Sequence, residues 1–424
     1  MTKTDPYRPW LNFIALLTAL CTFVLIFLGG MVTSKHVGMS VPDWPNSYGY
    51  NMFLFPPSKW VGGILYEHTH RLLGTVVGFL ATMLTLMAWA PGKSLRGRKW
   101  IVILFAWFSV LNLMGTSAMV IAPTAFHLYP PAGDRLNILS QGMVTEVGMW
   151  LTAVIAFFCR RPEPRRWVRW IAAVCLIAMC IQGLLGGLRV DLINLPLAMV
   201  HGCFAQATFC LVVFAWIATS RWWPSAPDLT GAEDAQRGQW LIRLAVISVG
   251  VVFAQLIVGA VMRHLQAGLA IPDLPWAFGK LLPPMNDSQL NDANNLRATW
   301  GMNPVNLLQI WLHFSHRIGA LVVSATLLTL IGTILLHHRQ RRDLVVPAAI
   351  LGLLLVTQVT LGLFSVYLQK PADIASLHVA VGALVLATSF FIAVRAMRLY
   401  SLWYRHPAPS GYPVGSAGLQ GVGV

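Results

Sequence analysis

Residues 38–45 read GMSVPDWP and residues 268–275 read GLAIPDLP, and this repeated segment decides the fold. In both places an apolar stretch ends just before the segment and a long loop follows it. The next apolar stretch then opens with EHTHR at 67–71 or with HFSHR at 313–317. The order of features is therefore the same in both parts of the chain.

The match continues toward the end of each part. The sequence QGLLG at 182–186 corresponds to QVTLG at 358–362, and a histidine follows shortly after each, at His201 and His378. Self-similarity over such a distance indicates two copies of one structural unit.

The composition places these copies in a membrane. Of the 424 residues, 56% are apolar and only 11% are charged, and the mean hydropathy is +0.65. Soluble domains carry roughly 25% charged residues, so these values exclude a soluble globule, a disordered chain and a secreted disulfide scaffold. The net charge is +15, but the charged residues lie between apolar segments, so this charge does not indicate nucleic-acid binding.

A helix needs about 20 apolar residues to cross the hydrocarbon core. The sequence therefore predicts an all-α, polytopic protein with about ten spans, at 11–33, 62–90, 99–122, 140–159, 168–189, 197–219, 241–262, 307–336, 344–368 and 373–396.

The repeat divides these spans into two four-helix units, with an extra hairpin in the first. Each unit has an even number of spans, so both keep one orientation and the repeat is parallel. The expected parts are 1–98 and 167–222 for the first unit, 99–166 for the inserted hairpin, 240–400 for the second unit, and 407–424 for a disordered tail.

Basic residues orient the bundle. Two thirds of the 30 Lys and Arg residues lie at the termini and in every second connection, which predicts that both ends are cytoplasmic. The long loops 34–61 and 263–306 then face outward. The first apolar run is too long for a signal-peptide core, and a transit peptide is not evident, so we expect a bacterial cell membrane.

Four histidines occupy matched positions inside the predicted spans, where ionisable groups mark function by default. His70 pairs with His201 in the first unit, and His316 pairs with His378 in the second. Two neutral imidazoles at equal depth are suitable axial ligands for haem iron, whereas zinc would need further ligands. Hydrogen bonding between helices is the alternative.

Three charged residues adjoin these histidines. Arg71 and Arg317 each follow a histidine directly and can bind a haem propionate or extend to lipid headgroups. Glu67 lies one helical turn from His70, in a site expected to be apolar, where it can accept protons or hydrogen-bond the loop. The matching residue in the second unit is His313.

Other polar residues suggest structural roles. Asp43 and Asp273 are expected to cap the repeated loops or to hold an arginine, and no partner residue is evident for the intramembrane Glu146. The remaining histidines at outer edges are expected to be interfacial, and the cysteines to be small buried groups without a disulfide framework. These residues are His36, His68, His127 and His264, and Cys21, Cys159, Cys175, Cys180, Cys203 and Cys210.

On the GMSVPDWP segment, the ExxHR and HxxHR motifs and the two later histidines, the chain resembles the haem A synthase family over about 11–90 and 168–396. The resemblance implies a haem b cofactor between His316 and His378. It also implies haem o as the substrate between His70 and His201. Glu67 would then be the acid near the C8 methyl group, which is oxidised through alcohol and hydrated-aldehyde stages to a formyl group.

The same resemblance implies contact with haem o synthase and with cytochrome oxidase assembly factors, and it leaves the electron acceptor unidentified. The family has eight spans and some members have a cysteine pair in the first outer loop, whereas this sequence predicts ten spans and lacks that pair. Two alternatives stay open: a non-catalytic di-haem b cytochrome that exchanges electrons with quinone, and a transporter.

Overall fold

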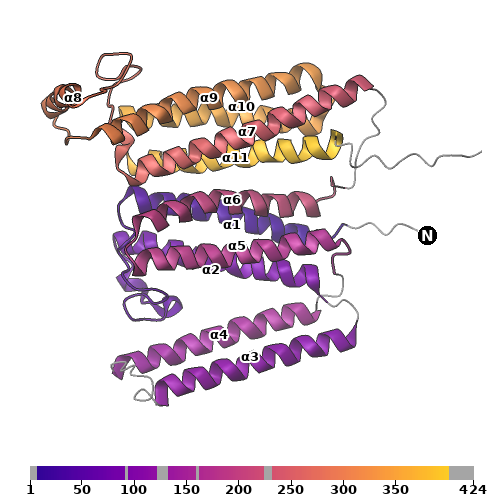
Figure 1. Ribbon diagram of the computed structural model, residues 1–424. Coiled ribbons are helices and arrows are strands. Elements are labelled where there is room, and N and C mark those ends of the chain that lie inside the picture. The colour runs from indigo at the N-terminus through magenta and orange to yellow at the C-terminus, as the bar shows by residue number, and fades with distance from the viewer. Residues whose placement is uncertain (1–6, 91–93, 122–131, 159–161, 224–231, 401–424) are drawn as a thin grey trace, which may run out of the picture.

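The computed structural model describes residues 7–90, 94–121, 132–158, 162–223 and 232–400, and within them the fold is helical (Figure 1). His127 and the predicted tail 407–424 lie outside these residues. The helices of the first half are α1 Pro9–Ser34, α2 Gly63–Trp89, α3 Leu95–Ile121, α4 Ala132–Phe158, α5 Arg166–Asp191 and α6 Leu195–Thr219. Those of the second are α7 Ala232–His264, α8 Asp287–Thr299, α9 Leu307–His337, α10 Arg342–Tyr367 and α11 Ala372–Tyr400.

The apolar helices confirm a polytopic, all-α membrane protein. Nine helices of the described chain are long and apolar enough to cross a bilayer. The remaining predicted span, at 140–159, falls on α4. Within the described chain the apolar stretch of α4 covers only Gly142–Ile155. The large apolar side chains exposed along these helices face lipid in a bilayer, where helices satisfy their own backbone groups.

Two groups of four helices share one packing pattern. In the first, α1 and α5 each pack against both α2 and α6; in the second, α7 and α10 each pack against both α9 and α11. The helices that carry the predicted ligands, α2 and α6 or α9 and α11, therefore lie at diagonal corners. Their side chains can meet across the centre of each group.

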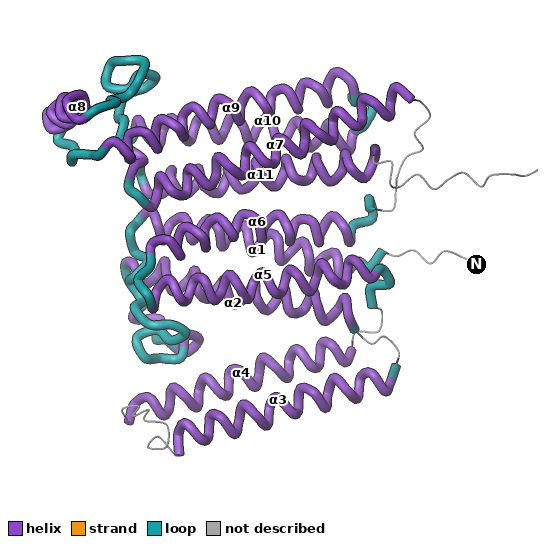
Figure 2. Tube along the Cα trace, in the orientation of Figure 1, coloured by secondary structure: helices purple, strands orange, loops and turns teal. Residues whose placement is uncertain are grey.

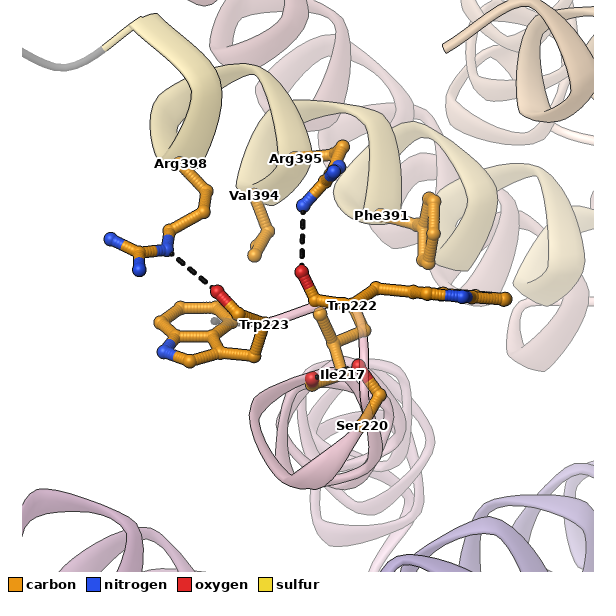
Figure 3. A pocket seen from close by; sticks show the side chains of 8 residues that line it. All are labelled: Ile217, Ser220, Trp222, Trp223, Phe391, Val394, Arg395 and Arg398. Atoms are coloured by element: carbon orange, nitrogen blue, oxygen red, sulfur yellow. Dashed lines mark hydrogen bonds between the residues drawn. The ribbon is translucent and has the colours of Figure 1, made fainter. Parts of the chain in front are cut away.

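The two groups meet where α11 packs against α1 and α6 (Figure 1). At the end of the bundle that carries the long loops, which is the predicted outer end, the Ser376 hydroxyl donates to Ser34 Oγ at 3.1 Å. At the opposite end, the predicted inner end, Arg395 Nη1 and Arg398 Nε of α11 donate to the carbonyl oxygens of Trp222 and Trp223, at 3.1 and 2.9 Å (Figure 3). These bonds tie the end of α6 to the second group.

The hairpin of α3 and α4 lies beside the first group, with α4 against α2 (Figure 1). Glu146 of α4 accepts hydrogen bonds from Asn112 Nδ2 at 3.0 Å and from the Ser109 hydroxyl, both on α3. Polar contacts of this kind hold membrane helices together. The structure therefore places Glu146 inside the hairpin, away from the four predicted ligands.

The long loops of both groups lie at the same end of the bundle (Figure 2). The second of these contains α8, in a stretch where the sequence predicts a loop because most of its residues are polar. Arg297 of α8 is buried and donates to the carbonyl oxygens of Leu269 and Ala270 at 2.8 and 3.1 Å. The helix thus braces residues 268–275, the second outer segment. Residues 38–45 are the first outer segment.

Candidate functional site

The four predicted ligands lie at similar depth, between six and nine residues inside the outer ends of their helices. At 1.5 Å per residue this is about 9–14 Å. Each imidazole is half-buried and rests on a glycine of a neighbouring helix. A Cβ atom added to that glycine would lie 3.0–3.2 Å from the ring's Cε1 atom. The pairs are Gly29 with His70, Gly186 with His201, Gly259 with His316 and Gly362 with His378.

The second pair has distances suited to a shared metal. The ring centroids of His316 and His378 lie 6.3 Å apart. Two axial imidazoles, with metal–nitrogen bonds of about 2 Å, have centroids about 6 Å apart. His378 Nδ1 lies 3.1 Å from the carbonyl oxygen of Gln358, and its Nε2 lies 3.4 Å from Gln358 Nε2. A proton on Nδ1, donated to that carbonyl, makes Nε2 the nitrogen whose lone pair can bind a metal.

The neighbouring glutamines also position these rings. Gln255 Nε2 donates to the His316 carbonyl at 2.7 Å and lies 3.0 Å from its Nδ1. In the first group, Gln182 Nε2 donates to the His201 carbonyl at 3.3 Å. Nδ1 of His70 and of His201 is buried and forms no hydrogen bond of standard geometry in the described part of the chain, although the backbone of Leu25 and that of Gln182 lie beside these rings.

These residues fit haem better than an ion held by a larger cluster. Within the described ranges no group of three or more His, Cys, Asp or Glu side chains could hold a metal ion. A haem supplies four ligands of its own, so two imidazoles suffice. Diagonal helices with glycines beside the rings provide two such pairs of imidazoles, one in each group.

A clamp holds the first outer segment over its group. Glu67 is buried, and its Oε2 accepts the Val41 N–H at 2.9 Å. Arg71 Nη2 pairs with Glu67 Oε1 at 3.0 Å and donates to the Val41 carbonyl at 2.6 Å. Arg71 Nη1 donates to the carbonyl oxygens of Asp43 and Asn46, at 2.6 and 3.0 Å. The expectation of an apolar site around Glu67 is therefore wrong.

The second group has the same clamp without a carboxylate. His313 Nδ1 accepts the Ile271 N–H at 3.1 Å, as Glu67 accepts that of Val41. Arg317 donates to the carbonyl oxygens of Ile271 and Trp276, at 2.7 and 3.0 Å. In the structure Arg71 and Arg317 both hold outer segments, and their binding of propionates stays a prediction.

The aspartates of the outer segments do cap these loops. The two carboxylate oxygens of Asp43 accept the N–H groups of Tyr48 and Gly49, at 2.7 and 2.8 Å. Asp273 does the same with Phe278 and Gly279, at 2.9 and 2.8 Å. Both glycines have a positive φ that suits a residue without a side chain.

His68 differs from its expected interfacial place. Its ring is fully buried beneath the first outer segment, where it contacts the rings of Phe55 and Trp60, and Ser47 Oγ lies 3.2 Å from its Nδ1. The sequence could not reveal this because the loop that covers His68 folds back over α2.

The sequence is similar to those of known proteins. Residues 143–390, from α4 to α11, match the model of a family described as cytochrome oxidase assembly protein. The chain belongs to this family.

Curated relatives have one name in common. A protein named heme A synthase from Beijerinckia indica is 26% identical over 397 residues, which cover 87% of this chain and 88% of the relative. One of the same name from Shewanella oneidensis is 24% identical over 410 residues, covering 94% and 99%. A third, from Novosphingobium aromaticivorans, is 27% identical over 294 residues, covering 68% and 76%. The predicted family is confirmed.

Proposed function

We propose that this membrane protein is a haem A synthase, an oxidoreductase that converts the C8 methyl group of haem o to a formyl group. Haem o is the substrate between His70 and His201, and haem b is the cofactor between His316 and His378. The main support is the distance of 6.3 Å between the ring centroids of His316 and His378. The first group has histidines and glycines at the equivalent positions. The relatives named heme A synthase support it.

The chain contributes position and orientation. Each glycine allows the neighbouring ring to approach its helix, and the carbonyl of Gln358 sets which nitrogen of His378 faces the metal. A bound haem b supplies one-electron chemistry to the second group. The outer segments, held by the two arginine clamps, cover both groups and keep water from their outer ends.

Glu67 is the proposed proton acceptor. Turning a methyl into a formyl group removes hydrogen and adds oxygen, so protons must leave the site. The carboxylate of Glu67 accepts two hydrogen bonds from protein groups and has about four lone-pair positions. It therefore retains the capacity to take a proton. The equivalent His313 stands beside the cofactor site, where no carbon is oxidised.

The cellular setting follows from the same proposal. We place the protein in a bacterial cell membrane, with both termini cytoplasmic and both histidine pairs near the outer face. Haem o reaches the first group from haem o synthase, and the product serves cytochrome oxidase assembly. Both sites lie near one face, which is a poor arrangement for a cytochrome that carries electrons across the membrane.

Expression in a host that makes haem o but no haem a tests the proposal. Haems are extracted from the membranes and separated by chromatography. We expect haem a to appear only when the chain is present. Membranes that yield the chain with haem b and unconverted haem o would identify the non-catalytic di-haem cytochrome instead.

A further inference from the structure

Two more arginines lie at the outer ends of the groups. Arg189 of α5 comes three residues after Gly186, the glycine that supports His201, and Arg263 of α7 comes four residues after Gly259, which supports His316. Residues three or four apart share a helix face. Each arginine therefore starts one turn outward from a glycine that faces a predicted haem ligand.

Both guanidinium groups belong to the loop-bearing side of the histidine pairs, because each arginine lies one turn from the glycine that touches a ligand ring. A positive charge close to a pair of neutral imidazoles does not stabilise the binding of the rings to one another. It does favour an anionic group bound beside them.

Neither arginine forms an ion pair among the described residues. Nη2 of Arg189 donates to the Gly38 carbonyl, and Nη2 of Arg263 donates to the Gly30 carbonyl and to Ser34 Oγ at 2.5 Å. In the described chain the side-chain hydrogen bonds of both arginines run through Nη2. Arg71 and Arg317, by contrast, use both terminal nitrogens on backbone carbonyls.

We propose that Arg189 and Arg263 bind the propionate carboxylates of the porphyrins in the first and second groups. The proposal rests on the proposed function. An arginine without a carboxylate is costly near the bilayer, and a propionate can accept a charge-assisted N–H bond from Nε or Nη1 of a guanidinium. These arginines replace Arg71 and Arg317 as the principal propionate partners.

The two positions are not equivalent in the repeat. Arg189 corresponds to Ser365 of the second group, and Arg263 corresponds to Thr33 of the first. The propionate edges of the two porphyrins therefore face different flanking helices, α5 in one group and α7 in the other.

This difference bears on which carbon is oxidised. In haem o the C8 methyl shares a pyrrole ring with a propionate. Arg189 and Glu67 both bond the first outer segment, at the Gly38 carbonyl and at the Val41 N–H, so a propionate held by Arg189 would place the adjacent methyl on the side of the group where Glu67 lies. Arg189 is thus a positioning residue for the reaction.

The test uses binding of haem b and of its dimethyl ester, which has the same ring without the carboxylates. For the second group, the His70→Ala/His201→Ala protein carries Arg263→Gln. For the first group, the His316→Ala/His378→Ala protein carries Arg189→Gln. Arg243→Gln, at an exposed position near the inner end of α7, is the matched control in both. Dissociation constants are measured by absorbance titration of the haem-free proteins.

We expect each arginine variant to bind haem b about 10- to 100-fold more weakly, the loss of one charge-assisted contact, and to bind the ester within about twofold of its parent. Unchanged haem b binding would overturn the proposal, and so would an equal loss for both probes, which indicates a structural role. If the chain with all four histidines binds neither probe, the proposed function itself fails.

Discussion

The two four-helix groups share one architecture but have different residues three positions before the histidine ligands His70 and His316. In each group an arginine and one further side chain hold the outer segment. The further side chain accepts the N–H of Val41 in the first group and that of the equivalent Ile271 in the second. That side chain is Glu67 in the first group and His313 in the second. Either residue anchors the segment, so anchoring alone does not require a carboxylate in the first group. The two groups therefore share one scaffold and differ in the acid–base character of the residue one turn from the histidine ligand.

The largest expected effect is at the second histidine pair. His316→Ala and His378→Ala should each abolish the low-spin haem b spectrum of that group, because one imidazole cannot complete the axial pair. Absorbance of the purified protein measures this. His337→Ala, at an exposed position on the inner end of α9, is the control, and a wild-type spectrum in both ligand variants would refute the assignment.

Glu67→His should convert the first clamp into the kind found in the second group. We expect the outer segment to stay anchored and the low-spin spectrum to stay intact. Formation of haem a should fall at least about 100-fold, because a positioned acid or base contributes that much. Glu67→Gln should behave likewise, whereas His313→Glu should keep the product. Full product yield from Glu67→His would dismiss the acid role.

The clamps should differ in stability as well. Arg71→Gln leaves the buried Glu67 without its cation and should lower the free energy of unfolding by about 3–5 kcal/mol. Arg317→Gln leaves a neutral His313 and should cost about 1–3 kcal/mol. Thermal unfolding in detergent compares the two. Adding Glu67→Gln to Arg71→Gln should recover part of the loss, and equal costs for the two arginines would contradict the asymmetry.

The smallest effect concerns the glycines beside the rings. Gly362→Ala places a methyl 3.1 Å from His378 Cε1, and we expect haem b binding to weaken by about 3- to 10-fold as the ring shifts. Gly250→Ala, on α7 with open space around the added methyl, should leave affinity unchanged. Gly186→Ala, the equivalent change in the first group, should weaken haem binding in that group alone. Titrations of Gly186→Ala and Gly362→Ala therefore distinguish the two groups.

Much of this arrangement could be predicted from the sequence. Apolar length locates the spans, and the matched motifs pair His70 with His316 and His201 with His378. The surroundings of Glu67 could not be predicted, because they depend on a loop that folds back so that Val41 meets α2. The helix α8 could not be predicted either, because it has too few apolar residues to stand out from the loop around it. The glycine contacts had a usable signal in the shared final glycine of QGLLG and QVTLG.

The most direct test of the central claim is the haem content of membranes from a haem o-producing host that expresses either the wild-type chain, His70→Ala or His316→Ala. We expect haem a from the wild-type chain alone, because in the proposed function one pair holds the substrate and the other holds the cofactor. Haem a in either variant at the wild-type level would contradict the assignment of one haem to each histidine pair.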